Sequence, residues 1–125
     1  MSKTILMGAS AMLVLAVALG AFGAHGLKGH LSAELMQTYK TAVEYHFYHA
    51  LGLLLLGALS LTMPSNLINL AALFLFVGIV LFSGSLYVLA ISGIKWLGAI
   101  TPLGGLSFIA GWILLFVAAW KKLPL

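Results

Sequence analysis

The chain has 125 residues, of which 63% are hydrophobic and only 6% are charged. A soluble domain carries about 25% charged residues, and a chain this short cannot bury so much apolar surface in its own core. The composition therefore excludes an ordinary soluble domain. It predicts a single integral membrane domain over residues 1–125, with the lipid bilayer as its main partner.

The net charge of +4 comes from six lysines against two glutamates. The lysines lie singly or as one pair near the ends of apolar stretches, whereas a nucleic-acid reader needs a clustered basic face. We therefore expect no nucleic-acid partner, and interpret the lysines as anchors at the lipid headgroups. The chain has no cysteine, which excludes disulfides, thiolate metal sites and thiol nucleophiles.

Four stretches are long and apolar enough to cross a membrane. A bilayer core about 30 Å thick needs about 20 apolar residues per helix. The stretches that meet this length are residues 4–24, 44–61, 67–91 and 101–120. No stretch alternates as the strands of a membrane barrel do. The sequence therefore predicts an all-α membrane protein, a compact bundle of four transmembrane helices.

The second span is expected to continue beyond the bilayer. Ser32 is a good helix N-cap, and residues 33–50 contain no glycine or proline. One helix over residues 33–61 would be about 43 Å long, which exceeds the bilayer core. Residues 33–43 are then an amphipathic helical extension in the membrane interface. The alternative is a separate interfacial helix with a kink near Glu44.

Small residues predict close helix packing in the first span. Ala16, Gly20 and Ala24 recur at a spacing of four, which forms a ridge that lets two membrane helices approach closely. The partner helix would belong either to this chain or to a second copy in a homo-oligomer. Gly26 follows the last histidine of this span and is expected to end the helix in the left-handed conformation.

The third and fourth spans carry further packing signals. Ser83, Gly84 and Ser85 predict a tight seam with hydrogen bonds to a neighbouring helix. Thr101 and Pro102 indicate the N-cap and first residue of the fourth helix, where the missing proline N–H costs nothing.

All four histidines and both acidic residues lie between His25 and His49. At 100° per residue, His46 and His49 lie about 60° apart on one helix face, and Glu44 lies about 200° from His46 on the opposite side. The first span ends where the second begins, so His25 is expected at the same membrane level as His46 and His49.

Three hypotheses account for these histidines. They fasten helices together by hydrogen bonds, or they form a polar pocket for a proton or small ligand with His25, His49, Tyr45 and His46, since histidine titrates near neutral pH. The third is a metal or haem held by His25 and His49, because imidazole suits both. The sequence contains no Gly-x-Ser-x-Gly elbow, phosphate loop or His-Glu-x-x-His, so we expect no enzyme and name no catalytic residue.

Residues 19–25, 45–51, 81–87 and 101–112 together resemble a family of small bacterial inner-membrane proteins of unknown function, to which the eukaryotic transmembrane protein 256 is similar. The resemblance covers nearly the whole chain. It implies a four-span protein of the bacterial cell membrane and supplies no activity. It also implies that glutamine is tolerated at His46, which favours His25 and His49 as ligands. The structural motif residues are Gly20, Gly23, Ser83, Gly84, Ser85, Thr101, Pro102, Gly104, Gly105, Gly111 and Trp112.

These observations lead to one main functional prediction and two alternatives. We expect a non-enzymatic binding or accessory protein with a polar His/Tyr pocket near one membrane face. The alternatives are a redox protein with metal or haem on His25 and His49, and a purely structural or assembly subunit. With four spans both termini share one side. The lysines divide three against three between the sides, and the pair Lys121 and Lys122 favours cytoplasmic termini.

Overall fold

The computed structural model describes residues 1–124, and all the regular secondary structure of these residues is helical. Four of its helical stretches are long and apolar enough to cross a membrane, which confirms the predicted all-α membrane fold. The elements in chain order are α1 (Ser2–His25), α2 (Ala33–Thr62), α3 (Asn66–Gly78), the π-helical segment η1 (Ile79–Ser83), α4 (Gly84–Ser92), the 3₁₀ segment η2 (Lys95–Ala99) and α5 (Thr101–Lys122).

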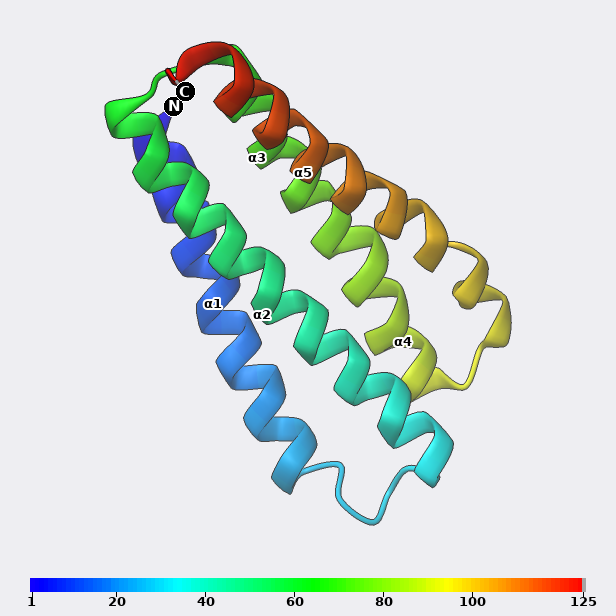
Figure 1. Cartoon of the computed structure of the whole chain (residues 1–125). Helices are drawn as coiled ribbons and strands as arrows, with labels where there is room; N and C mark the ends of the chain where they lie inside the picture. Colours follow the sequence, from blue (N-terminus) through cyan, green and yellow to red (C-terminus); the bar gives the residue numbers. More distant parts are fainter. Residues whose placement is uncertain (125) are drawn as a thin grey trace.

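The third span is composite, because α3, η1 and α4 follow one another without a break. Helix α1 packs mainly along α2, and α5 packs mainly along α3. Helix α2 also contacts α3, η1 and α4, so it lies between α1 and the rest of the molecule (Figure 1). The two termini lie at the same end, opposite the α1–α2 and α4–α5 connections.

Helix α2 is continuous over its 30 residues, as the sequence predicts, and does not kink at Glu44. Its length of about 45 Å makes it the longest helix and carries it beyond a bilayer core. Ser32 caps its start, because the Ser32 hydroxyl accepts a hydrogen bond of 3.1 Å from the backbone N–H of Leu35.

Two predicted helix ends differ from the structure. Gly26 has φ −75°, so it is right-handed and is not the left-handed stop we expected; its N–H bonds the Phe22 carbonyl. The left-handed glycine of this loop is Gly29, with φ 80°. Thr101 is the first residue of α5 rather than its N-cap. Its hydroxyl lies 2.6 Å from that of Ser85, so it joins α4 to α5 instead of capping α5.

The small residues of α1 pack against α2 of the same chain. A Cβ on Gly20 would contact Val43, and one on Gly23 would overlap the ring of Tyr39. Ala16 is fully buried, although Ala24 is exposed. Most of the predicted ridge therefore serves the α1–α2 contact, and a homo-oligomer stays a prediction.

Glycines also set the contact between α5 and the third span. A Cβ on Gly104 would overlap the backbone of Phe82, and one on Gly111 would press on Leu75. A Cβ on Gly105 would make only ordinary contact with Phe82. Gly84, by contrast, has open space around its Cα, so it is not part of a tight seam. The seam in this region comes from Gly104 instead.

Gly104→Ala is expected to lower the free energy of unfolding by about 1–3 kcal/mol, because the new methyl must displace the Phe82 backbone. The matched change Gly84→Ala is expected to alter it by less than about 0.5 kcal/mol. Unfolding in mixed micelles titrated with dodecyl sulfate measures both. Equal losses for the two variants would contradict this packing.

Candidate functional site

A buried polar network joins three helices around His46. The His46 side chain is only 2% exposed, and its Nδ1 lies 2.8 Å from the hydroxyl of Tyr87 in α4. The Tyr87 ring meets the ring of Tyr39 edge to face, with centroids 5.2 Å apart. The Tyr39 hydroxyl donates to the carbonyl of Leu19 in α1. These contacts link α1, α2 and α4 through polar side chains.

The second ring nitrogen of His46 has no hydrogen-bond partner. Among residues 1–124, Nε2 is the one buried side-chain nitrogen or oxygen atom that lacks a hydrogen-bond partner. The Met12 backbone of α1 lies close to the ring, but the contact falls outside hydrogen-bonding geometry. An unsatisfied polar atom in an apolar interior costs several kcal/mol at most and about 1–3 kcal/mol typically. The network is therefore complete at Nδ1 and incomplete at Nε2.

The π-helical segment η1 adjoins this network. Its last residue, Ser83, is fully buried and donates a hydrogen bond of 2.8 Å to the Ala42 carbonyl, one turn before His46 in α2. The next serine, Ser85, joins Thr101 in α5. These bonds confirm the hydrogen bonds expected from the serines of the third span. Single turns of π-helix occur frequently at functional sites.

His49 has different surroundings, although it is buried on the same face of α2. Its Nδ1 lies 2.8 Å from the Tyr45 carbonyl one turn earlier, so Nδ1 carries the proton and donates it. The ring stacks on Phe108 of α5, with centroids 3.5 Å apart and planes 8° apart, and Trp112 lies beside it. His49 therefore packs α2 against α5.

Tyr45 lies next to this stack and is 37% exposed. Its ring packs on Phe82, with centroids 4.5 Å apart, and lies roughly parallel to the ring of His49 at 6.0 Å. Tyr45 thus belongs to an aromatic cluster between α2 and the third span. It does not take part in the hydrogen bonds of His46.

The structure does not bring His25 to His46 or His49. His25 is exposed at the end of α1, where Gly23 contacts Tyr39 near the start of α2. Tyr39 precedes His49 by about 15 Å along α2, at 1.5 Å per residue. Because α2 packs on α1 from the first turns of α2, the end of α1 lies beside the α2 extension. His46 and His49 lie further along α2 and so do not reach His25.

This separation bears on the metal or haem hypothesis. A group ligated by both His25 and His49 would need the two rings close together, and they lie at different levels of the molecule. Within the described part of the chain, no cluster of three or more His, Asp or Glu side chains is placed to hold a metal ion. The geometry therefore does not support the predicted His25–His49 ligand pair.

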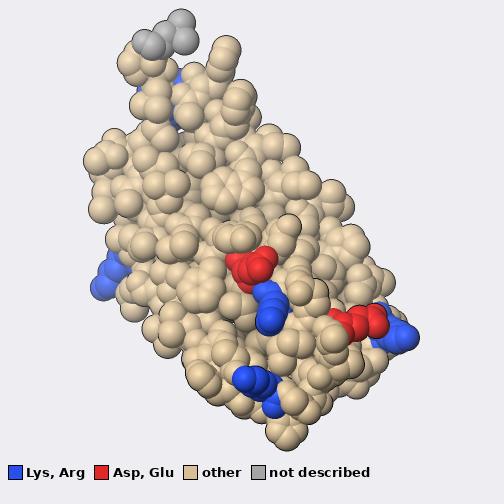
Figure 2. All heavy atoms as spheres, turned by 60° about the horizontal axis from the view of Figure 1, so that its bottom comes forward, with Lys and Arg blue, Asp and Glu red and all other residues tan. Residues whose placement is uncertain are grey.

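A shallow hollow of about 220 Å³ lies between α1 and α2 at the end near the loops. Gly20, Gly23, Tyr39, Lys40 and Glu44 are among its lining residues. Figure 2 shows both acidic side chains at this end of the molecule, with lysines beside them. Tyr39 therefore lies between this accessible, mostly apolar hollow and the buried network.

Two members of the network were not singled out as site residues from the sequence. Tyr39 shares a face with His46, seven residues away, and this periodicity was a usable signal. Tyr87 lies in another span, and only the packing of α4 on α2 brings its hydroxyl to His46. No sequence pattern predicts that register between helices.

The fold is that of a four-span integral membrane protein in which a buried histidine of α2 bonds a tyrosine of α4. Comparison with known proteins gives the family: the family model described as "Protein of unknown function (DUF423)" matches residues 19–105. The chain therefore belongs to this family of small membrane proteins.

Curated relatives agree with that assignment. The chain is 52% identical over 108 residues to the UPF0382 membrane protein SH2409 of Staphylococcus haemolyticus. This alignment covers 86% of the chain and 88% of the relative. The chain is 51% identical over 111 residues to the UPF0382 membrane protein YwdK of Bacillus subtilis, which covers 88% of this chain and 90% of that protein. No solved structure matches the chain.

Proposed function

We propose that this chain is a non-enzymatic accessory protein of the bacterial cell membrane in which His46 binds a proton. The observation that carries the proposal is the buried Nε2 of His46, which has no hydrogen-bond partner. A histidine that only fastened helices would be expected to use both ring nitrogens, as buried polar groups normally do. Ionisable residues within a membrane are energetically costly, so such a residue is a candidate functional residue.

The packing around His46 limits what it can bind. The ring is almost fully buried, and the nearest hollow ends at Tyr39 rather than at Nε2. Without movement of α1, the smallest species, a proton, is therefore the one that suits this position.

Protonation would give both ring nitrogens a hydrogen to donate. Nδ1–H would donate to the Tyr87 oxygen, and Nε2–H would point toward the Met12 carbonyl. The other titratable group nearby is Tyr39, a neutral phenol like Tyr87 at neutral pH, whereas Glu44 is exposed on the opposite side of α2. Burial opposes the charged ring and the Tyr87 oxygen favours it, so their balance sets the pH of protonation. Proton binding would thereby tighten α1 and α4 on α2.

The test follows the imidazole ¹⁵N resonances of histidine-labelled protein in nanodiscs between about pH 5 and pH 8, the range in which histidine switches. We expect the His46 signals to pass from one neutral tautomer to the doubly protonated ring. Tyr87→Phe is expected to shift that transition, because it removes the partner of Nδ1. His25→Gln alters an exposed residue and is expected to leave the transition unchanged.

A His46 ring that stays in one neutral tautomer throughout, in the wild type and in Tyr87→Phe, would contradict the proposal and favour a purely structural role. The unfolding free energy gives a second, independent reading. His46→Gln keeps a hydrogen-bonding side chain but binds no proton, so it is expected to abolish the dependence of stability on this transition while preserving the fold.

We also propose that both termini face the cytoplasm. The pair Lys121 and Lys122 lies directly after the last span, at the same end as Lys3, and clustered lysines next to a span favour the cytoplasmic side. A green fluorescent protein fused to the C-terminus is expected to fluoresce in cells, and an alkaline phosphatase fusion at the same place is expected to be inactive. The reverse pair of results would contradict this orientation.

A further inference from the structure

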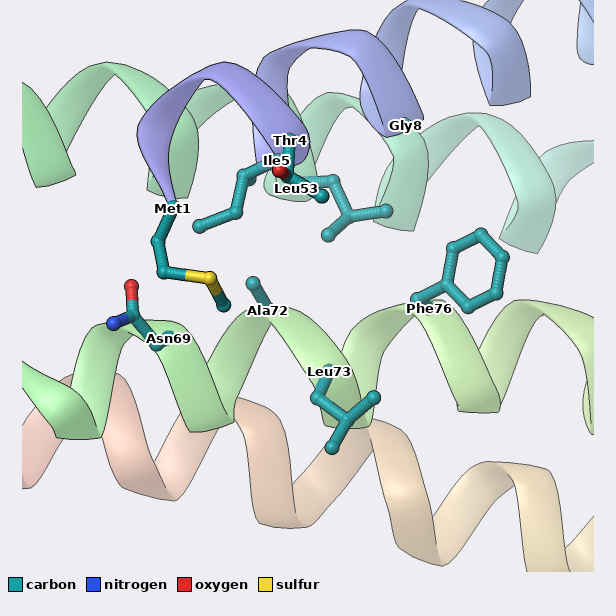
Figure 3. A pocket seen from close by; sticks show the side chains of 9 residues that line it. All are labelled: Met1, Thr4, Ile5, Gly8, Leu53, Asn69, Ala72, Leu73 and Phe76. Atoms are coloured by element: carbon teal, nitrogen blue, oxygen red, sulfur yellow. The ribbon is translucent and has the colours of Figure 1, made fainter.

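A second site lies at the opposite end of the molecule from the charged loops. An open groove of about 260 Å³ runs between α1 and α3 (Figure 3). Ile5 and Gly8 come from α1, Ala72 and Phe76 from α3, and Leu53 of α2 lies between the two helices. None of the His46 network lines it, so this site is independent of the proposed function.

The groove changes in polarity along its length. Thr4 and Asn69 lie near its outer end, within the first turns of α1 and α3. Gly8 lies about 6 Å deeper along α1, and Phe76 about 10 Å deeper along α3. The deeper part is lined by apolar side chains. The groove is thus apolar, with its two polar side chains at the outer end, and this arrangement suits the apolar chains and polar head of a phospholipid.

Asn69 is the most informative residue of the groove. Its side chain points into the groove beside Met1 (Figure 3). The Asn69 side chain is half-buried, and its amide can donate a hydrogen bond to a ligand in the groove. An ester carbonyl of a lipid is an acceptor found at this depth.

The charge at this end determines which lipid is expected. Lys3, Lys121 and Lys122 lie here, whereas Glu34 and Glu44 both lie on the first half of α2, toward the other end. Lysines near an anionic surface attract it electrostatically. Apolar contact alone does not favour one lipid over another, since all lipid tails are about as apolar as leucine. Selectivity must therefore come from the polar end.

We propose that the groove binds one anionic phospholipid. An acyl chain lies along the deeper part beside Phe76, an ester carbonyl accepts a hydrogen bond from the Asn69 amide, and the phosphate lies toward the lysines. The lipid would fill the space that separates α1 from α3 and so hold α1 against the rest of the protein.

Native mass spectrometry of the purified protein in detergent tests this with two probes, dioleoylphosphatidylglycerol and dioleoylphosphatidylcholine. We expect one copy of the anionic lipid to survive activation that removes the zwitterionic lipid. Gly8→Leu is expected to abolish this adduct, because a side chain there meets open groove space. Gly84→Leu is the matched control, since Gly84 also has open space but lies outside the groove.

Asn69→Leu provides a variant that keeps the shape of the side chain and does not depend on filling the groove. It is expected to weaken retention of the anionic lipid about fivefold, the effect of losing one hydrogen bond. Equal, weak retention of both lipids in all variants would mean ordinary surrounding lipid and overturn the proposal. A dimer that Gly8→Leu abolishes would also overturn it, because a second copy would then occupy the groove.

Discussion

Polar groups in the hydrocarbon core of a membrane find no water, so they must bind one another within the protein. Three side chains in this structure meet that constraint by donating to a backbone carbonyl of a neighbouring helix. They are Tyr39, Ser83 and Ser107, which bind the carbonyls of Leu19, Ala42 and Phe74. Each bond joins two helices at one position and excludes other registers. His46 is the exception, because one of its ring nitrogens remains unsatisfied.

The register of α1 on α2 follows from this constraint and from small residues. Near the termini, the Ser60 hydroxyl lies 2.7 Å from that of Ser2. Near the loops, Tyr39 binds Leu19 and packs on Gly23. The whole of α1 therefore pairs with α2. This pairing places Met12 at His46 and leaves the end of α1 beside the first turns of α2.

The same pairing separates the two proposed sites. Toward the loops, charged residues surround a hollow that adjoins Tyr39, and the His46 network lies behind it. Toward the termini, an apolar groove runs between α1 and α3, with Asn69 near its outer end. A proton at the first site would act on the contacts of α1 with α2. A lipid at the second would act on the gap between α1 and α3.

Much of the fold was predictable from the sequence, because hydrophobic length and helical period determine spans and faces. The four spans, the long α2 and the burial of His46 and His49 all follow from these patterns. The level of His25 and the contact of Tyr87 with His46 did not, because they depend on how one helix slides along another. Gly84 and Gly104 make the same point: both are glycines near helix starts, and only packing shows that Gly104 is crowded.

The register of α1 on α2 underlies the His46 site, and disulfide cross-linking can measure it because the chain has no cysteine. The pair Ser2→Cys and Ser60→Cys is expected to form an intramolecular disulfide on mild oxidation, since the two hydroxyls lie 2.7 Å apart. The pair His25→Cys and His49→Cys is expected not to form one. Efficient cross-linking of the second pair and none of the first would contradict the register and the site built on it.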